Sequence, residues 1–137
     1  MRGVYDKYKE RIAELFYKLV VDGGCTEIYC FRKLVEADLN VIPDIKLNEH
    51  QVDALIPLKP NLVVQCECTL SERLDEEKVK SMGEVKRMFE SLGVRCKTLV
   101  IGRKSFCQTI CDSNFLSFDE ISDKASVVSK IFALVTA

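Results

Sequence analysis

Two carboxylates stand out because each lies inside an apolar stretch with the composition of a β-strand. Asp53 lies in Val-Asp-Ala-Leu-Ile, and Glu67 lies in Val-Val-Gln-Cys-Glu-Cys-Thr-Leu. Side chains alternate between the two faces of a strand, so Gln65, Glu67 and Thr69 share one face. A turn at residues 59–61 folds the first stretch back beside the second. The two carboxylates are therefore expected to converge at one surface of a sheet.

Two such anions repel each other, and one takes up a proton unless a cation lies between them. A divalent metal would use both as oxygen ligands. Mg²⁺ or Mn²⁺ held by a few carboxylates and waters is a common device for phosphodiester hydrolysis. The alternative is that Asp53 and Glu67 are edge-strand residues that face solvent or pair with Lys or Arg. The pattern alone leaves both interpretations open.

The composition excludes several other kinds of site. The chain has 137 residues with 20 basic and 21 acidic side chains, a net charge of −1, so a bulk electrostatic attraction for nucleic acid is not expected. His50 is the single histidine, which excludes an HExxH zinc helix, and neither GxGxxG nor GxxxxGK[ST] occurs. Uncharged runs reach only seven residues, and no signal peptide is recognisable. We therefore expect a soluble, cytoplasmic protein without membrane contact.

The seven cysteines form no recognisable disulfide or metal motif. Their odd number, without CxxC spacing, argues against an extracellular disulfide framework. Cys66 and Cys68 share the strand face opposite to Glu67, and we interpret them as small buried hydrophobic residues. Cys107 and Cys111 leave a bridge or half of a metal site open as an alternative.

The elements that would position the carboxylates follow from hydrophobic periodicity. We predict helices at residues 4–21, 75–92 and 122–135, and strands at 25–31, 51–57, 62–70, 98–101 and 115–118, with 32–44 ambiguous. Short turns favour an antiparallel meander for the first three strands, and the helical crossover makes the strand at 98–101 parallel to that at 62–70. The predicted fold class is α/β, a mixed sheet flanked by helices in α-β-β-β-α-β order. We expect a single domain over residues 1–137, with a core at about 5–102 and a C-terminal strand and helix within 103–137.

The helix predicted at 75–92 brings two lysines near its apolar stripe. A step of about 100° per residue places Lys78 near the middle of the stripe that contains Met82 and Val85, and Lys86 at its edge. Lys78 would then face the sheet within reach of the carboxylates. The alternative is a lysine that snorkels beside the core.

The sequence contains Asp53, then a gap of thirteen residues, then Glu67-Cys68-Thr69 and a helix rich in Lys and Glu. This arrangement resembles the PD-(D/E)XK nuclease superfamily. The resemblance covers about residues 5–102 and is greatest to the archaeal and phage-type resolvase, Mrr-like and CRISPR-associated branches. It implies a restriction-endonuclease-like core. It also implies that Asp53, Glu67 and the Cys68 carbonyl bind Mg²⁺ or Mn²⁺.

One position departs from the superfamily pattern, because Thr69 occupies the place of the motif lysine. A threonine can hydrogen-bond a water or a phosphate but supplies no positive charge. The resemblance therefore implies one of two things. Either Lys78 or Lys86 acts in place of the motif lysine, with Thr69 as an accessory donor, or the site is degenerate.

Three functions are consistent with these residues. The first is a metal-dependent nuclease that hydrolyses phosphodiester bonds of DNA, in preference to RNA. Gln51, Gln65 and Lys104 would contact the substrate, and a homodimer would enlarge the surface that contacts the nucleic acid. The second, favoured by the missing motif lysine, is a catalytically degenerate nuclease-fold domain that acts in nucleic-acid binding or subunit assembly. The third is a small α/β interaction protein whose apolar segment at 131–135 packs against a partner.

Overall fold

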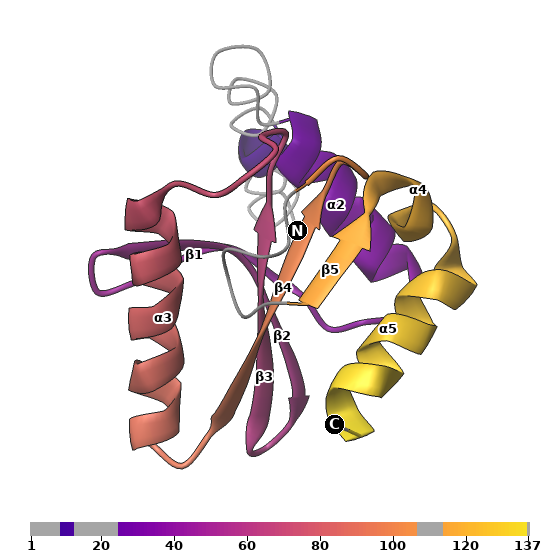
Figure 1. Ribbon diagram of the computed structural model, residues 1–137. Coiled ribbons are helices and arrows are strands. Elements are labelled where there is room, and N and C mark those ends of the chain that lie inside the picture. The colour runs from indigo at the N-terminus through magenta and orange to yellow at the C-terminus, as the bar shows by residue number, and fades with distance from the viewer. Residues whose placement is uncertain (1–8, 13–24, 107–113, 137) are drawn as a thin grey trace.

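The computed structural model describes residues 9–12, 25–106 and 114–136, with only the backbone course given for 25–27. The strands are β1 (Ile42–Leu47), β2 (His50–Lys59), β3 (Leu62–Cys68), β4 (Arg95–Gly102) and β5 (Asn114–Ser117). The helices are α2 (Cys25–Glu36), α3 (Glu76–Ser91), α4 (Phe118–Ile121) and α5 (Lys124–Thr136), and residues 9–12 are also helical. Figure 1 shows α3 on one side of the sheet and α2, α4 and α5 on the other.

The five strands form one mixed sheet in the order β1-β2-β3-β4-β5. β1, β2 and β3 are antiparallel neighbours, whereas β3, β4 and β5 run parallel to one another. The parallel pairing follows from the crossover through α3, because a strand reached through a helix on one face returns in the same direction. The predicted α/β class and the predicted parallel pairing of β3 with β4 are confirmed.

The segment at 25–31, predicted as a strand, is the first part of helix α2. The buried positions Cys30, Leu34 and Ala37 follow one another at spacings of four and three, which is the period of a helix face. The segment 25–31 is rich in β-branched and aromatic residues, and it is too short to reveal the helical period. Packing against the sheet overrides its strand propensity. The first strand of the meander is instead β1, which begins in the ambiguous stretch 32–44 and ends beyond it at Leu47, whereas the first part of that stretch continues helix α2. The helix predicted at 4–21 falls mostly outside the described residues.

The core is divided by the sheet into two faces. Residues of α2, α4 and α5 pack with Val64 and Cys66 of β3 on one face. On the other face, Val85 of α3 packs with Val63 and Cys96. Since Val63 and Val64 are consecutive, β3 has the alternation expected of a strand buried on both sides. The α3 face is therefore the one that also receives the side chain of Glu67.

Helix α3 has well-defined ends. Asp75 is its N-cap, with the Asp75 Oδ1 atom accepting a hydrogen bond from the Lys78 N–H at 2.7 Å. Gly93 follows the C-terminal end with φ of 77°, a conformation that glycine adopts without strain. The predicted bounds of 75–92 thus include one capping residue at each end.

None of the helices in the described part of the chain is long and apolar enough to span a membrane.

The four cysteines whose side chains the structure describes, Cys30, Cys66, Cys68 and Cys96, are free thiols. Cys30 and Cys66 lie in the core, which confirms the interpretation of Cys66 as a buried hydrophobic residue, and Cys68 is half-buried against the same cluster. Burial raises the pKa of the Cys66 thiol, which keeps it protonated and unreactive. Cys107 and Cys111 lie outside the described residues.

Candidate active site

Asp53 and Glu67 face each other on neighbouring strands. The antiparallel register pairs Ala54 with Cys66, and its continuation by one step brings Asp53 and Glu67 together, where the two carboxyl groups interact directly. The Asp53 Oδ2 atom also accepts a hydrogen bond from the Cys68 N–H at 2.9 Å. The predicted convergence of the two carboxylates is therefore present, and a backbone donor of β3 orients one of them.

The pair is electrostatically unfavourable when both groups are ionised. The Glu67 side chain is only 12% exposed. Its burial is the largest cause that raises its pKa to about 8, and the Asp53 charge raises it further, whereas Lys78 opposes the rise. At neutral pH the pair therefore favours a bound proton on Glu67 or a neighbouring cation.

Lys78 supplies the positive charge closest to the pair among the contacts of the described residues. Its Nζ atom lies 3.0 Å from Glu67 Oε2 and donates a hydrogen bond to the Gln51 carbonyl at 3.1 Å. The Lys78 side chain is about one-quarter exposed (24%), so the ammonium group lies near the surface rather than in the core. A lysine in the first turns of α3 therefore reaches the carboxylate from above the sheet, as the helix pattern indicated.

Thr69 takes part in the turn that follows β3. Its N–H donates to the Ile101 carbonyl at 2.9 Å, and its Oγ1 atom accepts from the Ser71 N–H at 3.0 Å. Gly102 lies beside it, and a Cβ atom at position 102 would be 3.2 Å from the Thr69 carbonyl oxygen. The threonine hydroxyl thus takes part in a local turn. Thr69 carries no charge, and the cationic group at the pair is Lys78.

Gln65 lies beneath the site rather than at its surface. It is 2% exposed, and its Nε2 atom donates to the Met82 carbonyl at 2.8 Å. A second, weaker contact joins the same atom to Cys96 Sγ at 3.7 Å. A buried amide is stable only where its polar atoms find partners, so Gln65 fixes α3 over β3.

The other residues predicted for substrate are placed apart from the pair. The Gln51 side chain donates to Asp44, and only its carbonyl reaches the site. Lys104 forms an exposed ion pair with Asp119 at 3.0 Å. The structure therefore brings neither side chain into contact with the carboxylates.

Lys86 is also separated from the carboxylates. It lies about two turns, or roughly 12 Å, further along α3 than Lys78. Burial raises the pKa of Cys96 to about 11, and the charge of Lys86 opposes that rise, so Lys86 lies near the beginning of β4. Of the two predicted lysines, the structure brings only Lys78 to Glu67.

His50 has contacts that the sequence did not predict. It begins β2, and its imidazole joins two side chains of α3: Nδ1 lies 2.8 Å from Ser81 Oγ and Nε2 lies 2.8 Å from Glu84 Oε2. The only available signal was the three-residue spacing of Ser81 and Glu84, which places both on one helix face.

Mg²⁺ or Mn²⁺ fits the chemistry of these oxygen atoms. No group of three or more His, Cys, Asp or Glu side chains that could hold a metal occurs within residues 9–12, 25–106 and 114–136. Mg²⁺ nevertheless usually binds one or two carboxylates and completes its shell with water and phosphate oxygens. Asp53 and Glu67, with their mutual repulsion, satisfy that requirement, and the Cys68 carbonyl is the third ligand that the sequence motif predicts.

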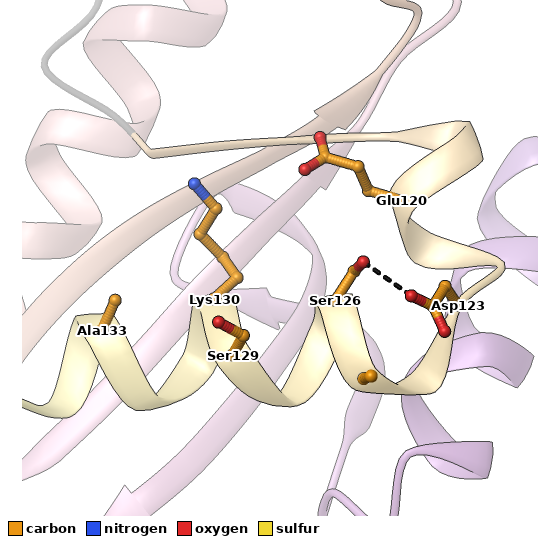
Figure 2. Close-up of a pocket in the computed structure, with 7 residues that line it drawn as sticks. Glu120, Asp123, Ser126, Ser129, Lys130 and Ala133 are labelled. Carbon is orange, nitrogen blue, oxygen red and sulfur yellow. Dashed lines mark hydrogen bonds between the residues drawn. The ribbon is translucent and has the colours of Figure 1, made fainter.

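A separate hollow of about 450 Å³ lies along α5 and α4, away from this pair. It is lined by Glu120, Asp123, Ala125, Ser126, Ser129, Lys130 and Ala133. Figure 2 shows that its polar groups come from these two helices and the turn between them, and that Ser126 is bonded to Asp123 at 2.8 Å. The Glu120 carboxylate caps α4 through the Ser117 N–H. The lining is thus explained by local helix structure.

Removing the charge of Glu67 is expected to stabilise the metal-free protein at alkaline pH. The raised pKa means that the folded state binds more protons than the unfolded state between about pH 4.5 and pH 8, so stability falls as pH rises through that range. We expect Glu67→Gln to unfold about 3–8 °C higher than the wild type at pH 9, with little difference near pH 4.

Thermal unfolding followed by circular dichroism with EDTA present measures this difference. Glu36→Gln is the matched control, because hydrogen bonds from Lys33 and Arg32 lower the pKa of that exposed carboxyl. It should bring no stabilisation at any pH. A Glu67→Gln protein that unfolds at a lower temperature than wild type at pH 9 would show that the carboxylate is net stabilising, contrary to this prediction.

Comparisons with known proteins show the fold. No protein-family model matches the chain, and no curated protein matches it. The structure is similar to that of the small subunit of the heterodimeric restriction endonuclease R.BspD6I, with a TM-score of 0.52 and 18% sequence identity, over 89% of this chain and 75% of that chain. The chain thus has a restriction-endonuclease-like fold, as predicted, and at this identity the similarity extends to the fold alone.

Proposed function

We propose that this chain is a metal-dependent nuclease that hydrolyses phosphodiester bonds of DNA. The observation that carries the proposal is the half-buried pair of carboxylates, Asp53 on β2 and Glu67 near the end of β3, with Lys78 against Glu67. Two neighbouring anions cost stability, and a carboxyl whose pKa is raised as strongly as that of Glu67 is typical of functional sites. The restriction-endonuclease-like fold supports the same conclusion, and RNA is the less favoured substrate.

The two carboxylates would hold Mg²⁺ or Mn²⁺ together with the Cys68 carbonyl. The bound ion would supply positive charge for the developing negative charge on the phosphate and help to activate a water. Asp53 is suited to this role because the Cys68 N–H occupies one of its oxygen atoms and fixes its orientation. Glu67 is suited because burial limits its motion and its hydration.

Lys78 would stabilise the negative charge of the phosphate. The Lys78 ammonium group contacts Glu67 and the Gln51 carbonyl. These two contacts fix the group, which has three donors in all, at the edge of the site. A phosphate oxygen of the substrate would be a further acceptor for the Lys78 ammonium group. Thr69 and Lys104 are proposed as contacts to more distant parts of the substrate, and Gln65 as a support of α3.

The chain is proposed to act as one of two subunits. The net charge of −1 gives little attraction for DNA, so a single copy has a small electrostatic footprint. The similar structure is a subunit of a heterodimeric restriction endonuclease. We propose a homodimer as the active form and a second, different subunit as the alternative, which light scattering of the protein at several concentrations distinguishes.

A cleavage assay with and without metal tests the proposed function. Supercoiled plasmid and labelled duplex, flap, four-way junction and single-stranded DNA are incubated with Mg²⁺, Mn²⁺ or EDTA, with an RNA duplex in parallel. We expect cleavage with Mg²⁺ or Mn²⁺ and none with EDTA. DNA binding that needs no metal, without cleavage under any condition, would favour the degenerate nuclease-fold domain, and neither binding nor cleavage would favour the interaction protein.

A further inference from the structure

His50 connects the beginning of β2, three residues before Asp53, to α3. Both ring nitrogens are used, since Nδ1 lies 2.8 Å from Ser81 Oγ and Nε2 lies 2.8 Å from Glu84 Oε2. The two partners lie on one face of α3. The imidazole is therefore held at both ends by a single helix face, and its side chain is only 21% exposed.

The same two elements also hold Lys78. Gln51, the residue after His50, accepts a hydrogen bond from Lys78 Nζ through its carbonyl at 3.1 Å. Lys78 precedes Ser81 by three residues, so both side chains lie on adjacent turns of one helix face. The contacts of His50 and of Lys78 are thus successive polar links between the start of β2 and the N-terminal half of α3.

Apolar packing secures α3 less specifically. The buried residues of the helix are Met82 and Val85, which belong to clusters with Val100 and Cys96 of β4. Apolar contacts are non-directional and leave the rotation of a helix about its axis weakly defined. Hydrogen bonds are directional, and Gln65 donates one to the Met82 carbonyl from β3. On the β2 side, the 2.8 Å hydrogen bond between His50 Nδ1 and Ser81 Oγ, with the Glu84 carboxylate 2.8 Å from Nε2, defines the rotation of the helix.

We propose that His50 is a positioning residue for Lys78. Through Ser81 and Glu84 it fixes α3 in the rotation that places the Lys78 ammonium against Glu67. The two ring nitrogens contact Ser81 and Glu84, which lie on one face of α3. The functional consequence of this inference rests on the proposed nuclease activity, but the placement of Lys78 does not.

A stability experiment tests the placement without any assay of activity. Melting temperatures are measured in EDTA at pH 9 for Lys78→Met, Glu67→Gln and the double variant, first with His50 present and then with His50→Ala. With His50 present, the two single effects should be non-additive, because the side chains are in contact. With His50→Ala, we expect the non-additivity to be lost.

Matched variants separate the loss of positioning from a general loss of stability. Val127→Ala removes methyl groups from a fully buried residue on the opposite face of the sheet, so it lowers the melting temperature but should keep the Lys78–Glu67 non-additivity. Glu84→Gln keeps a hydrogen-bond acceptor for His50 and should also keep it, whereas Ser81→Ala/Glu84→Ala should lose it. Non-additivity that survives His50→Ala overturns the proposal, whatever the outcome for nuclease activity.

Cleavage kinetics give a second readout if the protein is an active nuclease. His50→Ala is expected to lower kcat by roughly ten- to a hundredfold, with the metal concentration for half-maximal rate unchanged. In a protein that already carries Lys78→Met, His50→Ala should cause no further loss, because it acts through Lys78. A further loss of similar size in that protein would also overturn the proposal. Absence of cleavage in the wild type would refute the proposed function and leave the stability experiment decisive for His50.

Discussion

A protein with Asp53→Asn and Glu67→Gln is expected to cleave DNA at least about a thousandfold more slowly than the wild type in Mg²⁺ or Mn²⁺. Both substitutions keep the shape of the side chain and remove its charge, so they remove the attraction for a divalent cation. The amide introduced by Asp53→Asn would still offer an oxygen to the Cys68 N–H, and loss of the Glu67 charge relieves an unfavourable buried anion. The double variant should therefore fold, and its loss of activity reports on chemistry.

Single-turnover cleavage and isothermal titration of Mn²⁺ measure the two parts of this prediction. The control is Glu36→Gln/Asp38→Asn, which removes two carboxylates that lie outside the candidate site, on and just after α2, and pair with surface cations. Asp38 has φ of 63°, a conformation that asparagine tolerates, so the control should fold and cleave normally. Wild-type rates in the double variant would place the active site elsewhere, and normal Mn²⁺ binding without cleavage would restrict the carboxylates to a step after metal binding.

Replacing Lys78 with methionine is expected to reduce cleavage by roughly a hundred- to a thousandfold. Methionine keeps the unbranched stem that lies beside the helix but removes the charge that would stabilise the phosphate. The affinity for metal should stay the same or increase, because the competing ammonium group at Glu67 is lost. A lower rate with unchanged or tighter Mn²⁺ binding would therefore identify Lys78 as a group that acts on the substrate.

The position of the missing motif lysine provides a rescue experiment. Thr69→Lys in the Lys78→Met protein places a cation two residues after Glu67, at the start of the turn that follows β3, and should restore part of the lost rate. The Thr69 N–H extends the pairing of β3 with β4 to the Ile101 carbonyl, so we expect positions 67 and 69 on one face, which is the reason to expect recovery. Lys86→Met serves as the control, since Lys86 lies near Cys96 at the other end of the sheet, and we expect it to retain wild-type activity. If the Lys78→Met protein cleaves at the wild-type rate, the ammonium charge of Lys78 has no role in cleavage.

Several features of the site followed from local patterns. The period-two alternation of β3 and the turn at residues 59–61 predict that Asp53 and Glu67 converge on neighbouring strands. The register between the strands shifts between Pro57 and Lys59, so their exact pairing is not set by the turn alone. The helical period likewise predicts that Lys78 faces the sheet. In both cases, neighbours in sequence or along one element determine the outcome.

Other features depend on which elements meet in space. The run at 25–31 resembles a strand by composition, yet its helix is selected by the burial of Cys30 and Leu34 against the sheet. Gln65 was predicted at the substrate surface, but the packing of α3 over β3 covers it and supplies the Met82 carbonyl as its partner. His50 had no predicted role, because its partners Ser81 and Glu84 lie about thirty residues away in sequence and become neighbours only when α3 docks beside β2.

The sequence by itself determined the mixed α/β sheet, the two facing carboxylates and the lysine directed at them. These depend on periods of two and about 3.6 residues and on a short turn, which are properties of the local backbone. Tertiary structure alone decided the burial that raises the pKa of Glu67 to about 8, the covered position of Gln65 and the attachment of α3 through His50. Burial and long-range hydrogen bonds require elements distant in the chain to pack together, and no local pattern specifies which surfaces those will be.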